Sequence, residues 1–138
     1  MKVQVIRSNR KTIGLEVRED ESVILRAPAV DEISDVEWKS ILGEFTERVN
    51  HFCKVMDVTV GRITIRNQKT RWGSCSSKGN VNFNYQLYYM PRELMDYVII
   101  HELSHRRHMN HSAEFWQEVE KYCKTYRECR KKLRDYEI

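Results

Sequence analysis

The residues His101-Glu102-Leu103-Ser104-His105 combine types and a spacing that could do chemistry. On a helix, positions four residues apart lie on one face, one turn apart, so two imidazoles can bind one metal ion. Glu102 projects from the same side, about 100° around the helix axis from His101, and could reach a water on that metal. This arrangement is typical of zinc-dependent peptidases. Four of the five histidines fall within residues 101–111, which favours a metal site over unrelated core or surface histidines.

A catalytic zinc ion usually takes three protein ligands and leaves one position for water. His111 is the favoured third ligand, because Asn110 can adopt a left-handed conformation that ends the helix and turns the chain back. His108 is an alternative if the helix continues, since it lies seven residues after His101 on nearly the same face. Carboxylates from the next helix are further alternatives: Glu114, the most favoured of them, Glu118 and Glu120.

The histidine spacing also matches the metzincin pattern, in which a third His follows H-E-x-x-H after five residues. That pattern requires Gly at the position of His108 and a Met-turn downstream. Since no Met follows Met109, a true metzincin is excluded.

The helix that would carry the first two histidines is predicted over residues 91–108. Pro91 suits a first turn, where its missing N–H costs nothing, and Arg106 and Arg107 suit the negative end of the helix dipole. Apolar residues share the side of the two histidines and also fill the opposite side: Leu94, Val98, Ile99, Ile100 and Leu103. A helix that is apolar on most sides is buried, so we expect this one at the centre of the fold.

Hydrophobic periodicity and turn residues predict the remaining elements. A helix capped by Asp31 or Ser34 is expected to run to about Met56, with Val36, Ile41, Phe45, Val49 and Phe52 facing inward. The other predicted elements are an N-terminal β-meander with strands at 2–7, 12–18 and 22–27, a strand at 58–66, a polar loop at 67–80, a strand at 81–85 and a last helix at about 112–134. We therefore expect an α+β fold, with an N-terminal β region and helix over 1–57 and a core over 58–138, together one compact unit.

Length and composition indicate a globular protein. With 138 residues, 41% hydrophobic and 32% charged, the chain suits one domain, and it has no apolar run of membrane-spanning length. Its N-terminus lacks the apolar stretch of a signal peptide, so we expect a cytoplasmic location. The four cysteines form no C-x-x-C pair and are expected to be free thiols. Cys75 lies in a Gly/Ser-rich loop, but a cysteine nucleophile would need a histidine, and the clustered histidines are assigned to metal.

The net charge is +4, and the C-terminal part is more basic. Residues 121–138 contain seven Lys and Arg against three Asp and Glu. A basic helix can bind nucleic acid. A solvated outer face is the favoured interpretation.

Two further groups of residues could act on a substrate. Zinc peptidases commonly hold the substrate as an added strand at a sheet edge, and Asn82, Phe83 and Asn84 form the best candidate strand; an ordinary core strand is equally expected. A tetrahedral oxyanion also needs a stabilising group, and the candidates are Arg71, Tyr88 and Tyr89.

Several segments together resemble the YgjP-like metallopeptidase family: Arg71–Ser76, Asn82–Asn84, Asp96–His105, Asn110–Ser112 and Phe115-Trp116. The resemblance covers most of the chain and implies a zincin-like fold. The sequence His111-Ser-x-x-Phe115-Trp is also similar to the His-x-x-x-Phe of SprT-like and WLM proteases, in which that His is the third zinc ligand. The resemblance therefore supports His111 over His108.

These observations predict a cytoplasmic zinc metallopeptidase that acts on a polypeptide substrate. His101, His105 and His111 would hold one Zn²⁺, which would lower the pKa of a bound water toward ~7. Glu102 would take the proton of that water and pass it to the leaving amine. The alternative is a nucleic-acid-associated protein that uses the basic C-terminal helix, with a structural or non-catalytic zinc site. The oligomeric state stays open.

Overall fold

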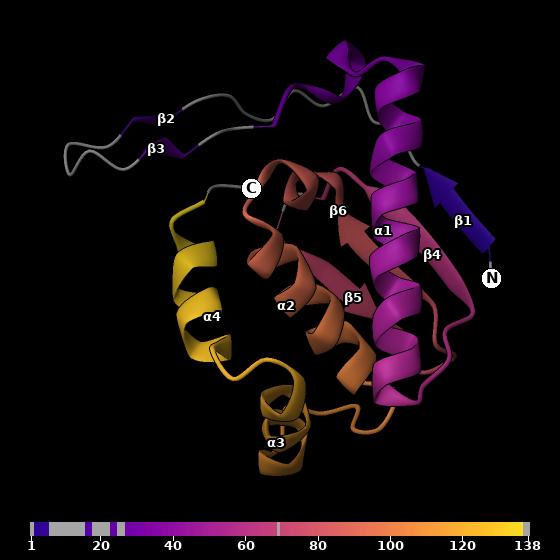
Figure 1. Ribbon diagram of the computed structural model, residues 1–138, viewed down its shortest axis with the longest axis vertical. Helices are drawn as coiled ribbons and strands as arrows, with labels where there is room; N and C mark the ends of the chain where they lie inside the picture. The colour runs from indigo at the N-terminus through magenta and orange to yellow at the C-terminus, as the bar shows by residue number, and fades with distance from the viewer. Residues whose placement is uncertain (1, 6–15, 18–22, 25–26, 69, 137–138) are drawn as a thin grey trace.

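A four-stranded sheet forms the framework of the molecule, and helices cover one of its faces (Figure 1). The computed structural model describes residues 2–5, 16–17, 23–24, 27–68 and 70–136. The strand order is β1-β4-β6-β5, in which β5 alone is antiparallel to its neighbour. The strands are β1 (Lys2–Val5), β4 (Arg62–Arg66), β5 (Gly73–Cys75) and β6 (Val81–Asn84). The fold is α+β, as predicted.

The N-terminal strands do not form the predicted meander. β1 joins the central sheet beside β4, in parallel, while β2 (Glu16–Val17) and β3 (Val23–Ile24) pair separately as an antiparallel ribbon. Periodicity predicts that a segment is extended but does not name its partner strand. The burial of Ile63 and Ile65 in β4 fits a strand that is paired on both edges. The division of the chain at residue 57 stays a prediction.

The long helix α1 (Asp35–Met56) begins and ends at strong capping residues. The Ser34 side chain accepts a hydrogen bond from the Glu37 N–H at 3.1 Å, and Asp57 adopts the left-handed conformation with φ of 55°. Val36, expected inside, is 76% exposed, and Trp38 is buried instead. The inner side of α1 is formed by Trp38, Ile41, Phe45, Val49, Phe52 and Met56.

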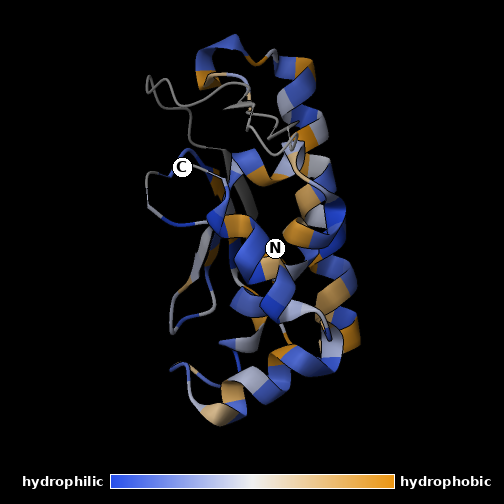
Figure 2. Cartoon of the chain, turned by 90° about the vertical axis from the view of Figure 1, so that its left-hand side faces the viewer, coloured by the Kyte–Doolittle hydropathy of each residue, from blue (hydrophilic) through white to orange (hydrophobic). Residues whose placement is uncertain are grey.

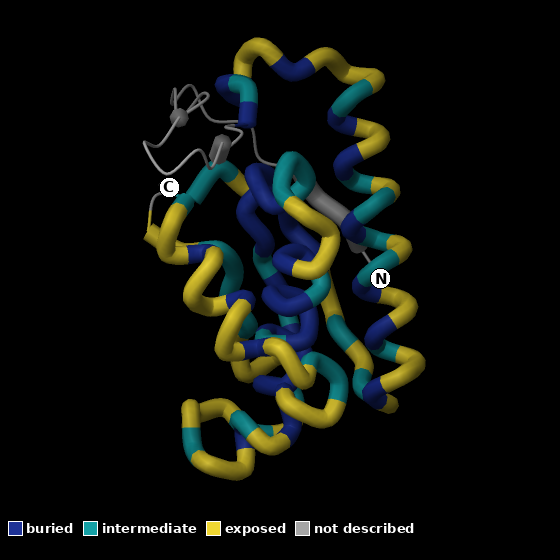
Figure 3. Tube along the Cα trace, turned by 60° about the vertical axis from the view of Figure 1, so that its left-hand side comes forward, coloured by how far each residue is buried: buried dark blue, intermediate teal, exposed yellow. Residues whose placement is uncertain are grey.

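Helix α2 (Arg92–Ser104) lies between the sheet, α1 and the C-terminal helices, and most of its residues are buried (Figure 3). It ends at Ser104, earlier than the predicted residue 108. The chain tightens there into i→i+3 bonds from the N–H groups of His105, Arg106 and Arg107. Asn110 does not take the predicted left-handed conformation. Among the described non-glycine residues, only Asp57 has a positive φ.

The predicted last helix is two helices, α3 (Ala113–Tyr122) and α4 (Tyr126–Arg134). The chain leaves the helical conformation at Cys123, which has φ of −141° and ψ of 89°. The break lets α4 turn back, so that the Tyr126 ring stacks on Trp116 at a centroid distance of 5.3 Å. The two rings are ten positions apart in sequence and belong to different helices, so the periodicity of a single helix does not reveal their contact.

The 67–80 loop contains a strand that was not predicted. β5 pairs with β6 through Ser74 and Asn82, and Gly79 turns the chain with φ of 89°. Figure 2 shows hydrophobic positions interspersed with hydrophilic ones along the helices, as expected for elements with one buried side. Among the described residues, no helix is both long and apolar enough to cross a membrane.

Candidate metal centre

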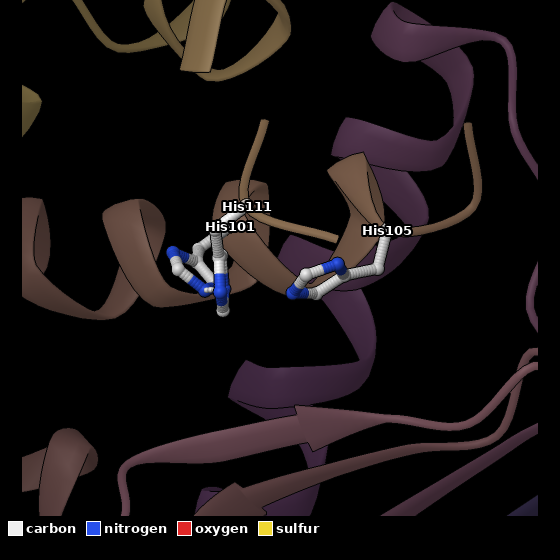
Figure 4. Close-up of side chains that lie close together, drawn as sticks. All are labelled: His101, His105 and His111. Carbon is white, nitrogen blue, oxygen red and sulfur yellow. Dashed lines mark hydrogen bonds between the residues drawn. The ribbon is translucent and has the colours of Figure 1, made fainter. Parts of the chain in front are cut away.

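Three histidines gather at the C-terminal end of α2 (Figure 4). One potential ligand atom from each of His101, His105 and His111 lies within 4.8 Å of the others. The Nε2 atoms of His101 and His111 are 3.3 Å apart. Neutral imidazole nitrogens are common zinc ligands, so this donor set fits one zinc ion.

The fold positions these rings by two different means. His101 lies on α2 and His105 caps it, one helical turn later. His111 comes from the segment before α3 and directly precedes the N-cap Ser112, whose hydroxyl accepts a hydrogen bond from Phe115 N at 3.3 Å. The Phe115 ring, fully buried, stacks on His105 at 4.5 Å and meets His111 at 4.9 Å. The α3 cap therefore fixes the third histidine against the first two.

Hydrogen bonds orient the two histidines of α2. His105 Nδ1 lies 3.0 Å from the backbone oxygen of His108, which can only accept, so Nδ1 carries the proton and Nε2 keeps its lone pair. The Tyr97 hydroxyl lies 3.2 Å from His101 Nδ1 and can accept a hydrogen bond from an Nδ1–H. A carbonyl partner fixes the tautomer of His105, and both partners orient rings that could bind a metal.

Burial shifts the pKa values of three side chains of the site. Burial, with the charges of His105, His111 and Arg130, lowers the pKa of His101 to about 3. Burial also lowers the pKa of His105. Both imidazoles are thus neutral at pH 7, the form that binds metal. Burial raises the pKa of Glu102 to about 8, against a lowering by Arg71.

The alternative third ligands lie outside the histidine cluster. His108 contributes its backbone oxygen to His105, and Glu114 is exposed in the first turn of α3. Glu118 is buried, but its carboxylate lies 3.1 Å from Lys121 Nζ and 3.6 Å from Arg107 Nε. Glu120 is exposed on the same helix and faces Arg127 at 4.0 Å. Among the described residues, only the three histidines form a group that could hold a metal ion.

Two cavities flank the histidines. The larger, of about 370 Å³, is lined by Arg71, Trp72, Gly73, Tyr97, Val98, His101, Glu102, Arg130, Leu133 and Arg134. The smaller, of about 240 Å³, is lined by Gly73, Ser74, Cys75, His101, Glu102, His105, Met109 and His111. Gly73, His101 and Glu102 line both, so they lie at the junction between the cavities.

The oxyanion candidates are separated by the fold. Arg71 lines the larger cavity together with His101 and Glu102. Tyr88 and Tyr89 line neither cavity, and the Tyr89 hydroxyl donates to a carboxylate oxygen of Glu37 at 2.6 Å. The two tyrosines therefore pack against α1 instead of facing the histidines.

The predicted substrate strand is wrong for a topological reason. β6, which contains Asn82, Phe83 and Asn84, is paired with β4 on one edge and β5 on the other. Its main chain cannot accept another strand. Phe83 is fully buried and stacks on Phe45 of α1. The edge strand beside the histidines is β5, and short strands of this kind carry a weak sequence signal.

Three residues of the site were not singled out from the sequence. Tyr97 precedes His101 by four residues, so helical spacing alone could have placed them together. Gly73 lies where β5 approaches α2: a Cβ atom there would be 3.1 Å from Glu102 Cγ. Arg130 reaches the larger cavity only because α4 turns back.

The cysteines are free thiols, as predicted. Cys75 lines the smaller cavity, where burial and the Glu102 carboxylate raise its pKa to about 11. A thiol with so high a pKa is not ionised at pH 7 and is a poor nucleophile.

A family model described as YgjP-like, metallopeptidase domain, matches residues 29–136 of this sequence. The chain belongs to the YgjP-like metallopeptidase family. The match spans both α1 and the histidine cluster. No curated protein matches this YgjP-like chain.

Solved structures resemble this YgjP-like chain in fold. The metallopeptidase zymogen of Pyrococcus abyssi abylysin is 25% identical, with a TM-score of 0.59 over 64% of this chain and 90% of that one. Wss1 from Saccharomyces cerevisiae is 14% identical, with a TM-score of 0.58 over 95% of this chain and 91% of that one. A Wss1 mutant gives a TM-score of 0.60 at 12% identity over 95% of this chain and 92% of that one. The family and the abylysin zymogen agree on a metallopeptidase, and the Wss1 structures show that the predicted zincin-like fold is shared.

Proposed function

We propose that this protein is a zinc-dependent peptidase in which His101, His105 and His111 hold one Zn²⁺. The observation that carries the proposal is the convergence of three imidazoles within 4.8 Å, beside the buried carboxylate of Glu102. The hydrogen bonds on the Nδ1 side of His101 and His105 support it, because they leave Nε2 free to bind. The predicted cytoplasmic location is part of this proposal.

Glu102 is the proposed general base and acid. A bound zinc ion supplies Lewis acidity, which acidifies water and polarises the scissile carbonyl. Glu102 lies at the junction of the two cavities, where its carboxylate takes the proton of the attacking water and returns it to the leaving amine. Burial raises the pKa of Glu102 in the metal-free protein, and the positive charge of a bound zinc ion would act in the opposite direction, favouring the carboxylate that serves as base.

The substrate is proposed to bind as an extended polypeptide along β5. The Trp72 oxygen accepts a hydrogen bond from Asn84 N at 2.8 Å, and Ser76 N donates to Asn80 O at 2.9 Å. In an antiparallel ladder the pairing residues alternate, so the N–H and C=O groups of Gly73 and Cys75 point away from β6. Both residues line the smaller cavity, and their free main-chain groups can pair with a substrate strand. Arg71, at the larger cavity, remains the candidate oxyanion stabiliser.

Metal content tests the first part of the proposal. We expect one zinc per chain in the purified protein, and strongly reduced zinc in His101→Ala and His111→Ala. His108→Ala is the matched control, because its side chain lies outside the cluster. A wild-type protein that binds no zinc tightly would refute the site, and zinc retained in His111→Ala would refute the third ligand.

The role of Glu102 is tested by Glu102→Gln, which keeps the shape and removes the base. We expect zinc binding to persist and the cleavage rate of an unfolded protein substrate to fall about 10²–10⁴-fold. Turnover is measured on zinc-loaded samples of equal metal content. Cleavage at the wild-type rate in Glu102→Gln would remove Glu102 from the mechanism.

A further inference from the structure

We propose that the larger cavity is a subsite for a substrate carboxylate, bound by Arg130 and Arg134 with Arg71 at the same cavity. This inference rests on the proposed peptidase function and names its substrate class: a polypeptide with an acidic group next to the cleaved bond. The cavity holds three arginines and one acidic residue, the buried Glu102. Its local charge therefore favours an anion.

The three cavity arginines lack the partners that arginines elsewhere in the fold have. Arg48 binds Asp96 through two hydrogen bonds of 2.9 and 2.8 Å, and Arg107 donates to two backbone oxygens at 3.0 and 2.9 Å. Within the described part of the chain, the guanidinium groups of Arg71, Arg130 and Arg134 have no hydrogen bond or ion pair, and only the backbone oxygen of Arg71 accepts a bond, from Asn84 Nδ2 at 3.3 Å. Their N–H donors are thus available to a ligand, and guanidinium groups match carboxylates in two-bond geometry.

Arg130 is held in place without its donors being used. Its guanidinium carbon lies 4.5 Å from the centroid of the Trp116 ring, which itself stacks on Tyr126. A cation–π contact engages the face of the guanidinium and leaves its N–H groups at the rim. The ring stack thereby orients Arg130 beside the cavity, which reduces the entropy cost of binding a carboxylate.

The position of the cavity relative to β5 defines which substrate residue enters it. Arg71 and Trp72 line the larger cavity, while Cys75 lines the smaller, so the chain of β5 runs from the larger toward the smaller. We take the substrate strand to be antiparallel to β5, the more stable pairing per residue, so that it runs the other way. Its C-terminal half then lies at the larger cavity, and the arginines receive the residue that follows the cleaved bond.

Succinyl hydroxamate peptides test this subsite by binding, independently of turnover. The hydroxamate binds the metal, and the adjacent side chain enters the position after the cleaved bond. Three probes are compared. The first has a Glu side chain and a C-terminal amide, and the second has a Gln side chain and a C-terminal amide. The third has a Gln side chain and a free C-terminal carboxylate. Dissociation constants are measured by calorimetry on the zinc-loaded protein.

We expect at least one carboxylate probe to bind about tenfold more tightly than the Gln amide, in line with charge-assisted hydrogen bonds to an exposed site. The Glu probe and the free acid distinguish a side chain from a chain terminus. Arg130→Gln is expected to abolish the preference while the Gln amide binds as before, which shows that the metal site is intact. Arg134→Gln is the second variant and is expected to weaken the preference.

Arg127→Gln is the matched control. Arg127 lies on the same helix and also contacts an aromatic ring, at 4.9 Å from Tyr126, but it faces Glu120 and does not line the cavity. The preference should be unchanged in this variant. A preference that survives in Arg130→Gln, or is lost equally in Arg127→Gln, overturns the assignment.

The remaining outcomes separate this inference from the proposed function. Equal binding of the three probes overturns the carboxylate subsite and leaves the metal site standing. Failure of every probe to bind overturns the peptidase proposal and the subsite with it. Displacement of equally bound probes by a single-stranded DNA oligonucleotide, dependent on Arg130, would assign the arginines to phosphate and overturn the carboxylate subsite.

Discussion

At the scale of residues, the hydrogen bond at Nδ1 of His101 and of His105 decides whether Nε2 of the same ring is available to a metal ion. His105 donates from Nδ1 to a backbone oxygen, which a substitution at residue 108 leaves in place. His101 instead relies on a side chain, the Tyr97 hydroxyl at 3.2 Å. A mutation of the partner residue can therefore remove the interaction of His101 but not that of His105.

Tyr97→Phe removes the hydroxyl and keeps the buried ring. We expect zinc affinity to fall about 10-fold, because the orientation and basicity of His101 lose their support. A competition titration with a chromophoric chelator measures the change. Tyr88→Phe, remote from the histidines, should leave affinity unchanged, and equal affinities in all three proteins would exclude a positioning role for Tyr97.

The pKa of Glu102 predicts how the metal-free protein responds to pH. Its folded value of about 8 exceeds the ordinary 4.5, so between these values the folded state holds a proton that the unfolded state has lost. Stability is therefore lost as pH rises toward 8, by up to about 1.4 kcal/mol per pH unit. The lowered pKa of His101, about 3 against 6.5, acts in the opposite direction below pH 6.5.

Urea unfolding of the chelator-treated protein between pH 6.5 and 8 isolates the Glu102 contribution. We expect Glu102→Gln to remove the slope, whereas Glu120→Gln, at an exposed position, should retain it. In Glu102→Gln, acidification below pH 6.5 should then lower stability through His101. A wild-type free energy of unfolding that is flat from pH 6.5 to 8 would contradict the shifted pKa.

The spacing of residues in the sequence predicted those parts of the site that lie close together along the chain. His101, Glu102 and His105 follow from helical geometry, and His111 from its proximity in the chain. Arg130 could not be predicted, because its place beside the histidines depends on a break between two helices. The placement of Tyr89 away from the histidines likewise involves a distant residue, because its hydroxyl donates to Glu37.

At the scale of elements, the close approach of β5 to α2 brings the edge strand to the metal centre. Gly73 makes the approach possible. A Cβ atom there would lie 3.0 Å from the Asn82 oxygen and 3.1 Å from both Glu102 Cγ and Val98 Cγ1. The neighbours include backbone of the paired strand, which cannot move without disturbing the sheet.

Gly73→Ala should therefore force β5 and α2 apart. We expect a loss of about 1–3 kcal/mol in the free energy of unfolding and weaker zinc binding, measured by urea denaturation and chelator competition. Gly43→Ala is the matched control: it lies in α1 with open space around its Cβ position and should gain about 0.5–1 kcal/mol. A Gly73→Ala protein as stable as wild type would show that the contact is not tight.

Element existence was more predictable than element ends. Ser34 and Asp57 mark the ends of α1 through side-chain and backbone preferences that act locally. At the end of α2 a histidine side chain bonds to a later carbonyl, an interaction that no helix propensity indicates. The strand β5 has three residues, too few for a periodic pattern.

At the scale of the whole molecule, Arg107 connects segments that are distant in sequence. It follows α2 and donates to the backbone oxygens of Met56 and Asp57, at the end of α1. Its Nε also lies 3.6 Å from the buried carboxylate of Glu118 in α3. The segment that carries His111 is thus attached to α1 on one side and α3 on the other.

Arg107→Gln would leave a buried carboxylate and two helix-terminal carbonyls without this donor. We expect a stability loss of about 1–3 kcal/mol and weaker zinc binding, because the segment before α3 loses its attachment. Lys121→Gln removes the exposed partner of Glu118 and should cost less than about 1 kcal/mol. Equal effects of the two substitutions in thermal and chelator titrations would contradict this role for Arg107.

The partner of β1 shows what sequence could not provide at this scale. Its parallel pairing with β4 joins residues about sixty positions apart, as in Val3 opposite Ile63. Such a pairing depends on the entropy of closing a long loop and on the packing of the whole sheet. No local pattern distinguishes it from a meander.

The break between α3 and α4 separates, along the chain, the proposed zinc ligands from the arginines that α4 brings to the larger cavity. All three histidines and Glu102 belong to one continuous stretch of eleven residues, whereas Arg130 and Arg134 lie beyond the break at Cys123–Thr125. A change of α4 can alter what the cavity accepts without touching a proposed ligand. Substitutions within the nine-residue helix α4 can therefore change which substrates the cavity accepts, while the proposed zinc ligands and Glu102 stay the same.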